Sequence, residues 1–328
     1  MNFFQIISEI EKVDPEVYDR LDSRRSIFKH MTGLGQKLSA AAVPLALGSI
    51  FNKVYAQTPV GASVNDVLNF ALSLEYLESY FYQRSAAGSG ASAVTLRGGF
   101  SGTNLAAIDL IRTDEANHVT FLRSVLGTAA IADPGAATFD FTGGKGAAGG
   151  PFADVLTNPL TYLAVAQSLE DTGVRAYKGG AALLMSNKTV LTAALNIHSV
   201  EARHASRLRT MRRAGPMNNA ASQGLPVSPY NAAPKSWISG TDNGGAGGSP
   251  TGPTAPIYGA GNNTGAPTGV TFDAESNTTQ GGAVLTGLPN TTGFPASAFS
   301  EAFDEALDVT TVKTIARTFV VNGNNFLA

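Results

Sequence analysis

Residues 197–208 read IHSVEARHASRL, and they determine how the rest of the chain is interpreted. Ile197, Glu201, His204 and Leu208 recur three or four positions apart, which predicts a helix with these residues on one face. Burying a carboxylate and an imidazole without partners costs roughly several kcal/mol each, so this face needs a partner. Glu-x-x-His is the spacing at which one helix can offer two ligands to one metal centre.

A second Glu-x-x-His motif lies upstream at Glu115 and His118. It too interrupts an apolar face, which comprises Leu105, Ile108, Ile111, Leu122 and Val125. Two of the four histidines of the chain therefore occupy the same motif. One copy could arise by accident, but two copies on two apolar helix faces favour a shared site.

Each motif is preceded by another helical segment with a common pattern. Glu75 follows Ser-Leu and has Tyr82 seven residues later, and Glu170 follows Ser-Leu with Tyr177 at the same distance. The order is Glu, Glu-x-x-His, Glu, Glu-x-x-His, with each element on its own helix. Ferritin-like four-helix bundles build dinuclear carboxylate sites from this set.

The chain from about residue 63 to 215 therefore resembles a ferritin-like domain. Residues 74–82, LEYLESYFY, are most similar to the exported bacterial and desiccation-related branch of that superfamily. The resemblance implies an all-α, ferritin-like four-helix bundle with a dinuclear metal site. It also implies redox chemistry with dioxygen or peroxide. At matching offsets from Glu75 and Glu170, Tyr82 and Tyr177 would lie close enough to donate hydrogen bonds or an electron, and they are candidate catalytic residues; the alternative is that they are plain core aromatics.

Six residues are the candidate metal ligands: Glu75, Glu115, His118, Glu170, Glu201 and His204. Hard carboxylates with two imidazoles and no thiolate suit two iron ions or manganese, although zinc stays open. The competing hypothesis is a buried polar network without metal. A closed ring of Glu and His needs cations for charge balance, and the nearby Arg112 and Arg203 lie off the apolar faces.

Two further acidic residues are expected beside these ligands. Glu78 also faces inward one turn after Glu75, and the match with Glu170 favours Glu75 as the ligand, with Glu78 next to the site or as an extra ligand. Asp114 could orient the histidine of the opposite Glu-x-x-His helix. The position equivalent to Asp114 in the other motif is Val200, so that support is expected on one side only.

Composition excludes several classes of protein. The chain has 328 residues, 15% of them charged, and a net charge of −2, which offers no electrostatic footprint for nucleic acid. It contains no cysteine, which excludes disulfides, zinc–thiolate sites and iron–sulfur clusters. A hydrophobic content of 43% supports a sizeable core.

The N-terminal 56 residues are predicted to be an export signal. Arg24 and Arg25 precede an apolar stretch at 38–51 that is too short for an ordinary membrane span of about 20 residues. A cleavage site is plausible before Gln57, and the pattern resembles a twin-arginine signal. We therefore expect the mature protein in the periplasm or cell envelope, without a stable membrane span; an N-terminal amphipathic helix is the alternative.

The remaining boundaries follow from composition and from the predicted helix caps Ser63, Asn158 and Asn187. The bundle is predicted over residues 60–216, with 85–102 as a loop, a second helix from about Asn104 to Leu126, and a long connection from 128 to 157. Residues 217–297, rich in Gly, Asn and Pro, are expected to form irregular loops. Residues 298–328 regain an apolar pattern and are predicted to be a helical segment that docks on the bundle.

Three classes of function agree with these observations. The first is a ferroxidase or peroxide-consuming oxidase of the cell envelope. The second is a non-enzymatic metal-binding or desiccation-protective protein. The third is a structural bundle whose loop-rich extension binds partners. The sequence leaves the native metal, the substrate and the oligomeric state open.

Overall fold

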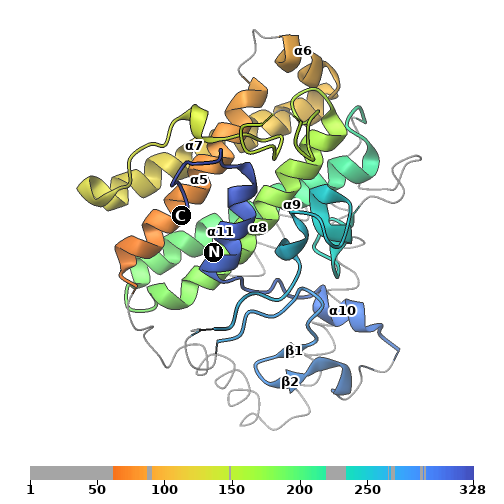
Figure 1. Ribbon diagram of the computed structural model, residues 1–328. Helices are drawn as coiled ribbons and strands as arrows, with labels where there is room; N and C mark the ends of the chain where they lie inside the picture. The colour runs from red at the N-terminus through yellow and green to blue at the C-terminus, as the bar shows by residue number, and fades with distance from the viewer. Residues whose placement is uncertain are drawn as a thin grey trace.

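Four long helices form a bundle in the computed structural model (Figure 1). They are α5 (Val64–Ala86), α7 (Gly102–Leu126), α8 (Pro159–Ala181) and α9 (Lys188–Ala214). The structure describes residues 62–86, 91–147, 149–218, 234–264, 266, 270–288, 291 and 293–328. The predicted export signal lies outside these residues. The fold class is all-α and bundle-like, as the sequence predicts.

Side-chain caps begin three of the four helices at the predicted residues. Ser63 and Asp66 exchange hydrogen bonds at the start of α5. Asn158 and Asn187 each accept a backbone N–H from the first turn of α8 and α9, respectively. Capping satisfies N–H groups that have no partner within the helix, and it fixes where each helix starts.

Helix α7 begins two residues earlier than the sequence suggests. Ser101 caps it and accepts the N–H of Asn104, which lies inside the first turn. The Asn104 side chain is buried and donates to the carbonyl of Pro216, which follows α9. Gly127 and Gly215 end α7 and α9 at positive φ, as expected of C-terminal glycines.

Contacts between the helices show their directions relative to one another. The first part of α5 lies beside the end of α7, where Tyr76 accepts from Arg123. The end of α5 lies beside the start of α8, where Tyr162 donates to Ser85 over 3.0 Å. Helices α8 and α9 are antiparallel neighbours, so α7 and α8 run in the same direction. The long connection between them makes this direction possible.

The predicted loop at 85–102 contains a helix, and that expectation was wrong. Helix α6 (Ala91–Gly98) packs beside the start of α7. Arg97 makes two hydrogen bonds to Asp109, at 2.8 and 3.0 Å. Leu96 and Phe100 are buried. The high content of Ser, Ala and Gly suggested a loop, but contacts with a residue twelve positions away stabilise this short helix.

The C-terminal part of the chain covers one side of the bundle. It contains the two-stranded hairpin β1 (Thr279–Gln280) and β2 (Ala283–Val284), the short helix α10 (Ala296–Ser300) and α11 (Val309–Ala316). Helix α11 packs against α8, and Figure 1 shows it in front of the bundle. After α11, the chain pairs with the α7–α8 connection through a bridge between Phe139 and Val320.

Two buried arginines attach this extension to the bundle. Arg175 of α8 is fully buried and pairs with Glu275 at 2.9 Å. It also donates to five backbone carbonyls of the extension, those of Ile257, Gly259, Asp273, Glu305 and Ala306. Arg209 of α9 pairs with Asp171 and with Asp242 of the extension, each at 2.5 Å. The irregular segment is therefore held by charge-assisted contacts to specific groups.

In the part of the chain that the structure describes, no helix combines the length and apolar character needed to cross a membrane.

Candidate metal centre

The six residues predicted as ligands come together in the centre of the bundle. All four glutamates have no exposed surface, and both histidines are buried. They form two groups whose ligand atoms lie within 4.8 Å of one another. The first group comprises Glu75, Glu115, His118 and Glu201, and the second comprises Glu115, Glu170, Glu201 and His204. Glu115 and Glu201 belong to both groups.

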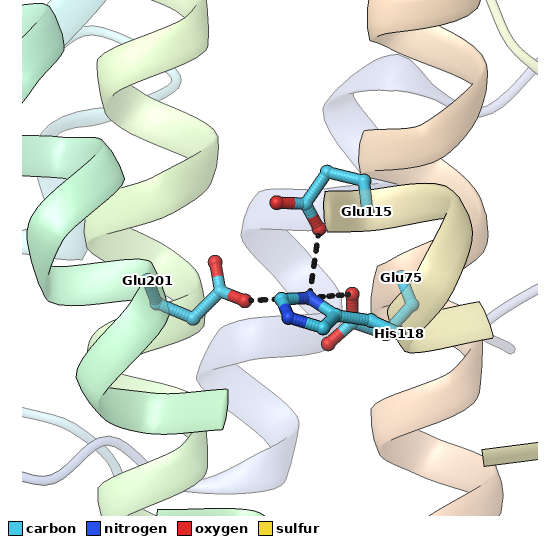
Figure 2. Close-up of side chains that lie close together, drawn as sticks. All are labelled: Glu75, Glu115, His118 and Glu201. Atoms are coloured by element: carbon cyan, nitrogen blue, oxygen red, sulfur yellow. Dashed lines mark hydrogen bonds and ion pairs between the residues drawn. The ribbon is translucent and has the colours of Figure 1, made fainter. Parts of the chain in front are cut away.

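Three carboxylates surround a single nitrogen of His118 (Figure 2). Its Nδ1 atom lies 3.1 Å from Glu75, 3.3 Å from Glu115 and 3.2 Å from Glu201. These side chains come from α5, α7 and α9. One N–H cannot make three well-aligned hydrogen bonds, because such a bond weakens steeply away from linearity. The four side chains thus bring ligand oxygen and nitrogen atoms within 4.8 Å of one another, close enough to hold a metal ion together.

His204 of α9 has a similar position in the second group, beside the shared Glu115. Its Nδ1 lies 2.9 Å from Glu115 and 3.3 Å from Glu170. Its other nitrogen, Nε2, lies 3.1 Å from Asp114 of α7. Asp114 therefore contacts the histidine of the opposite Glu-x-x-His helix, as the sequence predicts. This contact orients Nδ1 toward the carboxylates.

The two tyrosines connect the helices in a reciprocal way. Tyr82 of α5 donates to Glu170 of α8, and Tyr177 of α8 donates to Glu75 of α5. Both hydroxyls bond to Oε1, which leaves Oε2 of each glutamate facing the histidines. The equal spacing of seven residues in the sequence thus corresponds to a pseudo-symmetric pair of contacts.

Among the described residues, several buried ligand atoms make no hydrogen bond of good geometry, although all of them except Oε2 of Glu201 lie 2.9–3.3 Å from a ligand atom of another residue. They are Oε1 of Glu115, Oε2 of Glu170, both carboxylate oxygens of Glu201 and Nδ1 of His204. A buried polar group without a partner costs about 1–3 kcal/mol, and more when it is charged. Arg112 pairs with Asp109, and Arg203 contacts Ser199, so neither neutralises the cluster. The donor set therefore fits metal ions, which would satisfy these atoms together.

The pKa values of these side chains are shifted because several carboxylates are buried close together. Burial raises the pKa of Glu75 to about 7, although His118 opposes the shift. Burial and the neighbouring Glu115 raise the pKa of Glu201 well above its usual range. Burial disfavours the charged form of His204, but the negative charges of Glu170 and Glu115 outweigh this effect and raise the pKa of His204 to about 12. Without metal, protons on His204 and on the glutamates with raised pKa offset part of the repulsion between the carboxylates.

The two halves of the centre also differ three residues after Glu75 and Glu170. Glu78 lies three residues after Glu75, and Gly173 holds the equivalent place after Glu170. A side chain at Gly173 would place its Cβ 3.2 Å from Glu201 and 3.3 Å from Glu78. The glycine thus leaves room for these two carboxylates. Sequence reasoning missed Gly173, although aligning the two Ser-Leu-Glu segments would have revealed it.

One comparison with known protein families supports this architecture. No curated protein and no solved structure matched the chain. Residues 63–214 match a family model described as a ferritin-like domain. That segment contains the four long helices and every residue of the candidate centre. The chain therefore carries a ferritin-like domain over residues 63–214.

Proposed function

We propose that the bundle binds two metal ions, iron or manganese, in the centre of the four helices. One ion would be held by Glu75 and His118 and the other by Glu170 and His204, with Glu115 and Glu201 shared. The observation that carries this proposal is the set of overlapping ligand groups, several of whose buried oxygens make no hydrogen bond of good geometry. Four carboxylate charges would balance two divalent cations, and hard oxygen ligands suit iron and manganese.

We further propose that the centre supports redox chemistry with dioxygen or peroxide. Bound iron or manganese would supply the change of oxidation state. The protein contributes a buried environment in which oriented donors have strong effects, because little water screens them. Tyr82 and Tyr177 hold one oxygen of each terminal glutamate, and Asp114 holds the outer nitrogen of His204. These contacts fix the ligands before a metal binds.

The paired arginines before an apolar segment support a location in the periplasm or cell envelope. A twin-arginine route carries folded proteins, which would allow the metals to be inserted before export. This part of the proposal rests on the sequence.

The redox proposal is tested by consumption of dioxygen and peroxide in the presence of ferrous iron or manganese. The loaded protein should consume one of them faster than the metal-free protein does. Glu170→Gln should slow consumption while the helical far-ultraviolet signal stays unchanged. Metal binding without any consumption would contradict the redox proposal and would favour a metal-holding or protective role.

A further inference from the structure

A cavity of about 420 Å³ lies at the end of the bundle where α5 begins and α8 ends. The C-terminal extension lines it from the other side through Phe272, Leu307 and Val309. Ligand sites for small molecules commonly have volumes of about 300–1,000 Å³ and mostly apolar walls. The size and composition of this cavity therefore match those of a binding site.

Small residues near the end of α8 create this space. A Cβ on Gly179 would lie 2.2 Å from the carbonyl oxygen of Leu307, so the extension can pass closely only over a glycine. A Cβ on Gly180 would meet only Val67, at the ordinary contact distance of 3.4 Å. Space beyond Gly180 is therefore left open by the absence of a side chain.

A neighbouring cavity lies between this one and the candidate metal centre. A second, smaller cavity of about 30 Å³ shares four lining residues with the first: Val67, Phe70, Ala176 and Gly180. Its inner end is lined by Leu74 and Tyr177. The hydroxyl of Tyr177 donates to Glu75, so this one side chain contacts both the inner cavity and a candidate ligand.

The charged groups at the outer cavity are already engaged in local contacts. Asp66 bonds to Ser63, Asp308 accepts from Asn262 and Thr311, and Lys313 donates to the carbonyl of Ala328. The walls thus offer few free polar groups to a ligand. Water in such a space makes few hydrogen bonds, and its replacement by apolar surface is favourable.

We propose that the two cavities form one binding site for an uncharged, apolar organic molecule, which lies with its inner end against Tyr177. The outer cavity is much larger than a diatomic gas requires, and its two carboxylates disfavour an anionic ligand. The molecule would lie one side chain away from Glu75. This site does not depend on whether the centre performs redox chemistry.

The test measures binding of N-phenyl-1-naphthylamine, an uncharged fluorophore, to the metal-free protein. We expect saturable binding of one molecule, and weaker binding of the sulfonated form of the same ring system. Gly180→Leu should weaken binding of the uncharged probe by at least about tenfold. Gly180→Ala, which adds only a methyl group at contact distance, is the matched control and should retain most of the binding.

Two further variants keep the test decisive. Ala176→Leu narrows the same passage from a different turn of α8, and it replaces Gly180→Leu if that variant does not fold. Phe121→Ser removes an exposed aromatic ring on α7, and it should leave binding unchanged. Absence of saturable binding, tighter binding of the sulfonate, or equal affinity in wild type and the cavity variants would overturn the proposal. Metal uptake by the same samples separately tests the proposed centre.

Discussion

The hydroxyl of Tyr177 on α8 donates a hydrogen bond to Oε1 of Glu75 on α5, across the centre of the bundle. The bond directs the other oxygen of Glu75 toward His118. Tyr82 and Glu170 make the mirror contact in the opposite direction. A repeated sequence pattern therefore becomes a pair of contacts that orient the terminal ligands on both sides.

Tyr177→Phe should weaken binding of one metal ion while two ions still bind at saturation. The substitution removes the donor that orients Glu75, and losing such support typically reduces metal affinity by about 10–100-fold. Competition with a chromophoric chelator measures the affinity. Tyr80→Phe is the control, because its hydroxyl bonds to Asp133 outside the centre. Equal chelator curves for Tyr177→Phe and wild type would contradict the assigned role of the bond.

Asp114→Ala should reduce the affinity for the ion bound by His204 by a similar factor of about 10–100. The substitution removes the carboxylate that holds Nε2 of that ring. Asp109→Ala serves as the control on the same helix, since Asp109 pairs with Arg97 instead. If both aspartate variants retain wild-type affinity for both ions, Asp114 does not support the centre.

Arg175→Met should lower the free energy of unfolding by about 3–5 kcal/mol, because it leaves Glu275 buried without its cation. Five backbone carbonyls of the extension lose a charged donor at the same time. Arg203→Met on α9, where the side chain is exposed, should change stability by no more than about 0.5 kcal/mol. Denaturant unfolding of the metal-free proteins gives both values. A small effect at Arg175 would show that the extension is held by other contacts.

Arg24→Lys together with Arg25→Lys should retain the precursor in the cytoplasm, if the paired arginines are a twin-arginine signal. Cell fractionation with N-terminal sequencing checks this outcome. Mature protein from the cell envelope should begin near Gln57. An intact Met1 on envelope-located protein would argue against a cleaved signal.

Much of the bundle could be predicted because its signals are local. Ser63, Asn158 and Asn187 act within three residues of their own position, and the sequence identifies them as caps. The Glu-x-x-His spacing is equally local, and helix geometry places both side chains on one face. The repeated order of these motifs then predicts which four faces meet.

The parts that sequence reasoning missed depend on contacts between distant residues. In the sequence, nothing distinguishes Arg175 from an ordinary charged residue of a helix, because its carbonyl partners lie 82 to 131 positions away. Helix α6 depends on the pair between Arg97 and Asp109, which no short-range pattern reveals. The cavity beside Gly180 exists only because the extension passes over Gly179. Such features require knowledge of the packing.

The most direct test of the metal centre is the metal content of the protein after anaerobic loading with ferrous iron or manganese and removal of excess metal. Wild type should retain about two ions per chain. Glu115→Ala with Glu201→Ala removes both shared carboxylates and should retain none, whereas His198→Ala, a change outside both ligand groups on α9, should retain two. Circular dichroism checks that the double variant keeps its helices. Two ions in the folded double variant would contradict the proposed centre.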